Sequence, residues 1–297
     1  MNKYWFYKVG LVVVFLCFAL LGGAKVKLPT LVSDGMVLQR GEPVNIWGTA
    51  DPDETVDITF LKKKYKTVAD VQGNWKVTLP ILKAGGPYTM AINDIELKDI
   101  LIGDVWVCSG QSNMELPVSR VTDRFRDEIS TDSNYSMVRY IKTPLLYNFH
   151  APQADIPGIS WQAMTPENVM PFSALAYFFA KDVYQKTKVP VGIINSSVGG
   201  SPVEAWISEG GLKPFPFYLN EKRIYESDDL MESMKKEERK KSHAWNVALF
   251  QGDKGMHEAT PWYAADYDDS NWTETDLFTS GWATNGLNTV NGSHWFR

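Results

Sequence analysis

Two short turns in this sequence combine residues that could carry out nucleophilic chemistry. The first turn lies in "CSGQSNM", residues 108–114, and places Ser112 four residues after an apolar run that ends at Cys108. The second lies in "VGGSPVEAW", residues 198–206, and contains the paired glycines Gly199 and Gly200. A serine hydroxyl becomes a nucleophile when a base takes its proton, and backbone N–H groups in turns can stabilise an oxyanion. From residue types alone, Ser112 fits either a nucleophile or an ordinary hydrogen-bonding turn serine.

The surrounding elements must bring these turns together for any chemistry to occur. We expect strands at 104–108, 137–142 and 189–197, and a helix capped by Ser173 before the last of them. A helix followed by a continuously apolar strand is typical of a parallel α/β sheet, whose sites lie at the carboxyl ends of the strands. The sequence is not the nucleophile elbow of α/β-hydrolases, because Met114 stands where that motif has a second glycine.

The flanking regions differ in pattern from this α/β part. Residues 25–102 contain short runs of alternating polarity separated by turn residues, which predicts a small antiparallel β-sandwich. Residues 103–244 form the α/β part, within which the densely charged stretch 219–243 predicts a solvated helix. Residues 245–297 are rich in aromatic residues, Asp, Asn and Gly, and are expected to begin another β domain that is cut short.

The N-terminus has the pattern of a secretory signal. Lys3 and Lys8 accompany an aromatic start, an apolar run follows, and small residues ending at Ala24 favour cleavage there; an uncleaved anchor is the alternative. Residues 1–24 therefore predict a periplasmic or secreted protein with no stable membrane insertion after cleavage. The net charge of −5 and the lack of a dense basic patch argue against nucleic acid as a partner. Cys108 would be the single remaining cysteine and is expected to be a buried apolar residue.

The two turns taken together resemble a known family. "GQSNM" with "GGSPVEAW" is similar to the sialate O-acetylesterase-like carbohydrate esterases of the SGNH hydrolase superfamily. "LPTLVSDGMVLQRGEPVNIWGTA" and "GGPYTMAI" resemble the β domain that precedes their catalytic module. "DYDDSNWTE" and "GSHWFR" resemble the sugar-binding-like jelly-roll domain that interrupts it.

The resemblance implies a fold and a mechanism. The fold would be an incomplete SGNH-type parallel sheet, preceded by the β-sandwich and followed by the start of the jelly roll. Ser112 would attack the acetyl carbonyl of an O-acetylated sugar, and the N–H groups of Ser112 and Gly200, or Gly199, would hold the oxyanion. The residues that support the two motifs would be Gly110, Gln111, Asn113, Glu204 and Trp206. No metal or organic cofactor is implied, and no oligomeric state is assigned.

The sequence departs from the family pattern in one respect. The Gln-Gly-Glu segment with its following Asn, and the late Asp-x-x-His that supplies the base, are not found in these 297 residues. None of the four histidines has an aspartate three residues before it; they are His150, His243, His257 and His294. Because removing a triad member leaves only residual catalysis, this fragment alone is expected to have little or no esterase activity.

Two other interpretations remain open from sequence. One keeps the mechanism but makes acetylated xylan or another polysaccharide the substrate. The other makes the chain a carbohydrate-binding or scaffold protein, with Trp206, Trp262 and Trp272 as platforms for sugar rings.

Overall fold

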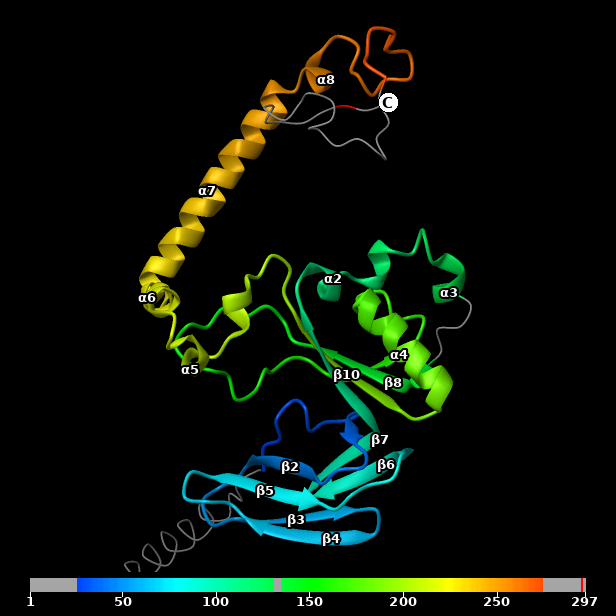
Figure 1. Ribbon diagram of the computed structural model, residues 1–297, viewed down its shortest axis with the longest axis vertical. Helices are drawn as coiled ribbons and strands as arrows, with labels where there is room; N and C mark the ends of the chain where they lie inside the picture. Colours follow the sequence, from blue (N-terminus) through cyan, green and yellow to red (C-terminus); the bar gives the residue numbers. More distant parts are fainter. Residues whose placement is uncertain (1–25, 131–134, 275–294, 296–297) are drawn as a thin grey trace, which may run out of the picture. The chain divides into compact units, whose positions relative to one another are not determined.

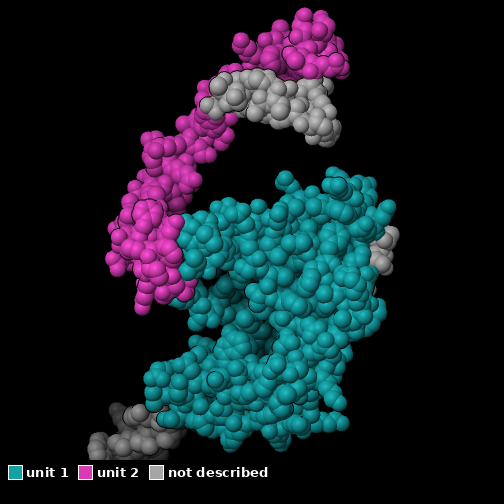
Figure 2. Space-filling view, in the orientation of Figure 1, with its two compact units in different colours: residues 1–207 teal, residues 208–297 magenta. Residues whose placement is uncertain are grey.

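The computed structural model describes residues 26–130, 135–274 and 295, which fall into two compact units, one ending in sequence at Ile207 and the other starting at Ser208 (Figure 2). The predicted signal peptide, residues 1–24, lies outside the described residues. Most of 275–297 lies outside them as well.

The first unit begins with a β-rich region. Its strands are β1 Val37–Gln39, β2 Val44–Thr49, β3 Thr55–Phe60, β4 Lys63–Val68, β5 Asn74–Leu79, β6 Gly85–Ile92 and β7 Ile95–Gly110. Strands β4, β3, β6 and β7 pair in that order, while β2 and β5 form a separate antiparallel pair. Alternate residues of β3 and β5 are buried, as their period-two sequences predict, and they share one apolar core that includes Ile46, Ile58 and Leu79.

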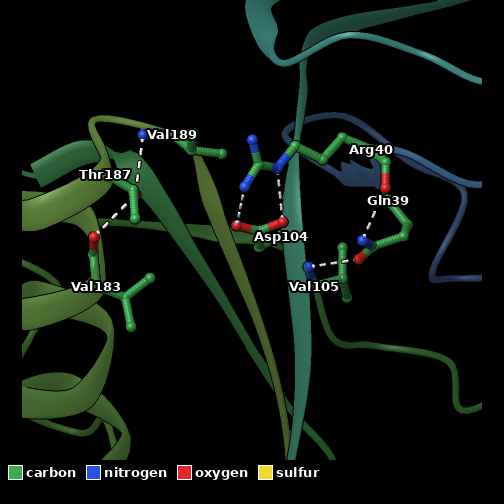
Figure 3. Close-up of polar contacts among 7 residues, drawn as sticks. All are labelled: Gln39, Arg40, Asp104, Val105, Val183, Thr187 and Val189. Carbon is green, nitrogen blue, oxygen red and sulfur yellow. Dashed lines mark hydrogen bonds and ion pairs between the residues drawn. The ribbon is translucent and has the colours of Figure 1, made fainter.

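Strand β7 belongs to two parts of the sheet (Figure 1). Its first half pairs antiparallel with β6, and from Asp104 onward it pairs parallel with β10 Val191–Ser197. Figure 3 shows the crossover point, where the Arg40 guanidinium donates two hydrogen bonds to the Asp104 carboxylate at 2.8 and 3.0 Å. The Val105 N–H also donates to Gln39 Oε1 at 2.8 Å (Figure 3). These contacts tie the last residue of β1 and the residue after it to β7, at the point where the pairing partner of β7 changes.

The α/β part follows β7. Strand β10 lies between β7 and β8 Tyr135–Lys142, all three parallel, and β9 Gln162–Met164 pairs antiparallel with β8. Helix α4 Ala174–Thr187 packs on β8 and β10, and its N-cap is Ser173, whose side chain accepts the Ala176 N–H. The expected strands, helix and cap in this region are therefore confirmed, and the chain has a mixed α/β fold.

Short helices complete the first unit. They are α2 Ser112–Glu115, the 3₁₀ turn η1 Val118–Arg120, α3 Arg126–Ser130 and the 3₁₀ turn η2 Val203–Trp206. Glu204 and Trp206, which support the second motif, lie in the single 3₁₀ turn η2.

The second unit is helical where it is described. Its helices are α5 Glu209–Leu212, α6 Pro216–Tyr225, α7 Asp228–Gly252 and α8 Lys254–His257. The β domain expected from residue 245 is corrected here, because α7 continues to Gly252 through residues such as Ala248 and Leu249 that favour helix. Residues 253–274 contain no strand, and the jelly roll remains a prediction for residues outside those described. None of the helices in the described part of the chain is long and apolar enough to span a membrane.

Candidate active site

Ser112 stands at the point where β7 ends. Gly110 is the last strand residue and has a φ of +145°, a conformation that side-chain-bearing residues rarely adopt. Gln111 then reverses the chain, and Ser112 is the first residue of α2. Ser112 is exposed, and its hydroxyl has no hydrogen-bond partner among the described residues. The strand and the turn thus present an unengaged hydroxyl at the carboxyl edge of the sheet.

The second turn lies next to Ser112. Ser197, the last residue of β10, pairs with Gly110 in the parallel register, and the Val198 N–H donates to the Gly110 carbonyl at 3.0 Å. A Cβ built on Gly199 would lie 3.6 Å from both Cα and Cβ of Ser112. The structure therefore brings together the two turns that the sequence singled out.

The two glycines of this turn differ in hydrogen bonding. The Gly199 N–H donates to Glu115 Oε2 at 2.5 Å, so it is already engaged. The Gly200 N–H has no partner among the described residues. Gly200 has a φ of +76° and open space around it. In this arrangement Gly200, not Gly199, has an amide available for an oxyanion.

The motif-supporting residues have different surroundings. The Gln111 side-chain amide donates to the Ser201 carbonyl at 2.7 Å, which joins the first turn to the second. The Trp206 indole N–H donates to Ser201 Oγ at 2.9 Å, and its ring is 41% exposed. Asn113 is exposed and Glu204 half-buried, and neither side chain has a hydrogen-bond partner among the described residues.

Two further residues at this edge were not identified from sequence. Glu115 contacts Gly199 as described, and Asn195 is fully buried between the two turns. Asn195 donates to the Cys108 carbonyl at 3.3 Å and accepts from Ser197 Oγ at 2.9 Å. A polar residue inside the otherwise apolar run "VGIIN" was the available signal for Asn195, because buried amides need partners.

The core beneath the turns is apolar and shifts the titration of two groups. Burial raises the pKa of the Cys108 thiol, in keeping with its expected role as a buried apolar residue. Burial also raises the pKa of Tyr140 to about 12, so its hydroxyl stays neutral. That hydroxyl accepts the Ser173 N–H at 3.0 Å and so supports the start of α4.

An open cavity of about 590 Å³ adjoins the second turn. Its walls include Gly199 and Gly200 from the second turn, Trp206 from η2, and Leu145, Tyr147 and Phe149 from the loop after β8. Pockets of this size, with an aromatic wall and few polar groups, suit small organic ligands. The available Gly200 amide therefore lies at the rim of a space large enough for a sugar ring.

The histidines do not supply a partner for Ser112 among the described residues. His150 lies in the exposed loop after β8, and His243 is exposed on α7. A ring nitrogen of His257 lies 2.7 Å from the Phe250 carbonyl, and His294 is outside the described residues. Within the described part of the chain, no cluster of three or more His, Cys, Asp or Glu could hold a metal ion.

The sequence was compared with known families and proteins. The family described as "Carbohydrate esterase, sialic acid-specific acetylesterase" matches residues 102–269, which contain both turns and the strands that carry them. The chain belongs to this carbohydrate esterase family. Human sialate O-acetylesterase is 33% identical over 213 residues, 64% of this chain and 40% of that protein. The rat sialate O-acetylesterase is 31% identical over 230 residues, 69% of this chain and 42% of that protein.

The chain is also similar to a solved structure of a carbohydrate acetylesterase. The carbohydrate acetylesterase from Xanthomonas citri matches with a TM-score of 0.60 and 39% sequence identity, over 63% of this chain and 43% of that one. This chain spans about two fifths of the length of the curated relatives it matches.

Proposed function

We propose that this chain carries the nucleophile of a carbohydrate O-acetylesterase that removes acetyl groups from sugars, with O-acetylated sialic acid as the preferred substrate. The observation that carries the proposal is the exposed Ser112 hydroxyl beside Gly199, whose next residue, Gly200, has an unengaged amide. Membership of the esterase family and the names of the relatives support the substrate class. The segment 1–24 would direct the protein to the periplasm or outside the cell.

The proposed reaction proceeds through an acetyl-enzyme. Ser112 Oγ bonds to the acetyl carbonyl carbon, its proton passes to a base, and the carbonyl electron pair moves to oxygen. The N–H groups of Ser112 and Gly200 would stabilise this oxyanion. The bond to the sugar oxygen then breaks, and that oxygen takes the proton. Water next attacks the acetyl carbonyl carbon in the same way and releases acetate and free Ser112.

The base is the part of this mechanism that the described residues do not provide. Ser112 Oγ has no hydrogen-bond partner among them. We propose that an Asp-His dyad outside these 297 residues does so in the complete enzyme. The 297-residue chain alone is then expected to hydrolyse aryl acetates slowly or not at all.

The geometry can be tested without a base from the protein. In alkaline buffer, which takes up the serine proton, phenylboronic acid forms a tetrahedral anion on a serine oxygen and so imitates the oxyanion intermediate. We expect it to shift the amide NMR signals of Ser112 and Gly200 in a saturable way. The shifts should vanish in Ser112→Ala and persist in Ser109→Ala, which removes a neighbouring exposed hydroxyl and keeps the turn. Equal shifts in Ser112→Ala would overturn the assignment of Ser112.

A further inference from the structure

Glu115 is placed to control the second turn although it lies in the first. It is the last residue of α2, three positions after Ser112. Its Oε2 accepts the Gly199 N–H at 2.5 Å, across 84 residues of sequence. Hydrogen bonds to a carboxylate are shorter and stronger than those between neutral groups. A single side chain thus links the helix that begins at Ser112 to the turn that contains Gly200.

The packing around Gly199 makes this contact specific. A Cβ at position 199 would lie 2.6 Å from Glu115 Oε2 and 3.6 Å from Ser112 Cβ. The carboxylate therefore occupies the space that a side chain at position 199 would need. A side chain at position 199 would force the carboxylate to move away from its present place on the Gly199 amide beside Ser112.

The rest of the turn is held from its other end. Ser201 accepts the Gln111 side-chain amide through its carbonyl, and its hydroxyl donates to the Val198 carbonyl at 2.6 Å. Glu115 fixes the amide just before Gly200, and these contacts fix the residue just after it. Gly200, with its positive φ, then has little freedom in where its own N–H points.

We propose that Glu115 is a positioning residue that orients the Gly200 amide toward the oxyanion formed on Ser112. The proposal rests on the proposed function, because it assumes that Ser112 is the nucleophile and Gly200 a donor. It assigns Glu115 a role as hydrogen-bond acceptor and not as base. A glutamine at this position keeps an acceptor oxygen and removes the charge, so Glu115→Gln should preserve the arrangement that Glu115→Ala destroys.

The first measurement needs no ligand. In Glu115→Ala we expect hydrogen exchange at the Gly199 amide to accelerate about tenfold or more, because exchange follows the opening of a hydrogen bond. Glu115→Gln should stay within about threefold of the parent by the same reasoning. Glu128→Ala, which removes an exposed carboxylate on α3, is the control and should leave Gly199 unchanged. Unchanged exchange at Gly199 in Glu115→Ala would overturn the proposal.

The second measurement tests the consequence for the oxyanion. Loss of one oxyanion donor costs about 10²–10³ in rate, so a misdirected donor should weaken phenylboronic acid binding by about tenfold in Glu115→Ala. Gly199→Ala should have the same effect with Glu115 intact, since its Cβ displaces the carboxylate. Affinity that falls equally in Glu115→Gln would show that the charge matters and would reject the positioning role.

The two measurements separate this proposal from the proposed function. If boronic acid binding does not depend on Ser112, the proposed function fails, yet Gly199 exchange still reports whether Glu115 holds the turn. If binding depends on Ser112 but Glu115→Ala changes neither exchange nor affinity, the positioning role alone fails.

Discussion

Arg139 is a buried cation whose charge is balanced by one partner. Its side chain is 5% exposed, and its Nη2 donates to Asp99 Oδ2 at 2.7 Å, while its Nη1 is buried without a partner among the described residues. Asp99 lies on the first half of β7 and Arg139 on β8, so the pair joins the β-rich region to the parallel sheet. Removing the anion would leave a buried cation without compensation.

We therefore expect Asp99→Asn to lower the free energy of unfolding. The loss should be about 1–3 kcal/mol, below the value for a fully buried pair, because Asp99 is 54% exposed. Asparagine tolerates the positive φ of +57° at this position, so backbone strain should not contribute. Asp53→Asn is the matched control, since Asp53 has a φ of +62° and no ion pair in the described structure. Urea unfolding of both variants checks this, and equal midpoints would contradict it.

At the scale of single residues, the sequence predicted some residues of the candidate site and could not predict the others. Ser112 and Gly200 were identifiable because each follows an apolar strand in a turn of small residues, which is local information. Glu115 and Arg139 were not, because each acts through a partner 84 or 40 residues away. The difference between Gly199 and Gly200 was also hidden, since it depends on which amide the Glu115 carboxylate reaches.

At the scale of elements, Gly103 sets how closely β7 and β10 can approach. A Cβ there would lie 1.9 Å from the Pro190 carbonyl oxygen, which accepts the Asp104 N–H at 2.9 Å where the parallel pairing starts. Backbone atoms cannot move aside as a flexible side chain does. Only glycine permits this first contact of the parallel sheet.

Gly103→Ala is accordingly expected to destabilise the first unit by about 2–3 kcal/mol, the upper range for overpacking. Gly252→Ala is the control, because its Cβ would meet no atom within 4 Å and alanine favours helix. Thermal melting monitored by circular dichroism should show a lower Tm for the first variant only. A Tm for Gly103→Ala equal to that of the parent would mean that the close approach is absent in solution.

The boundaries of the elements show why their existence was easier to predict than their extent. Ser173 and the apolar run after Val189 gave α4 and β10 correctly. The domain boundary placed at residue 102 falls inside β7, because "ILIGDVWV" is strand-forming on both sides of Gly103 and no local signal marks the change of partner. Likewise, nothing near residue 245 ends α7 before Gly252.

At the scale of the molecule, strand β7 is shared by the two regions of the first unit, the β-rich region and the parallel sheet. β7 pairs antiparallel with β6 in the core that contains Leu79, and then parallel with β10 where the two candidate-site turns begin. The Arg40–Asp104 and Arg139–Asp99 pairs connect the same regions. Loss of the β-rich region would remove the support for β7, which ends at Gly110, two residues before Ser112. The two regions should therefore unfold together.

Leu79→Ala tests this coupling at a distance from the site. Leu79 is fully buried, so the substitution should cost about 2–5 kcal/mol. If the regions form one cooperative unit, hydrogen exchange at the most protected amides of β10 and of β5 should report the same loss in the free energy of unfolding. Lys76 lies on the exposed face of β5. Lys76→Ala should therefore change the free energy of opening at the amides of β5 and of β10 by less than about 0.5 kcal/mol. Faster exchange confined to β5, with β10 as slow as in the parent, would show that the parallel sheet stays folded without the β-rich region. Ser112 would then need only β7 and β10 to hold its position.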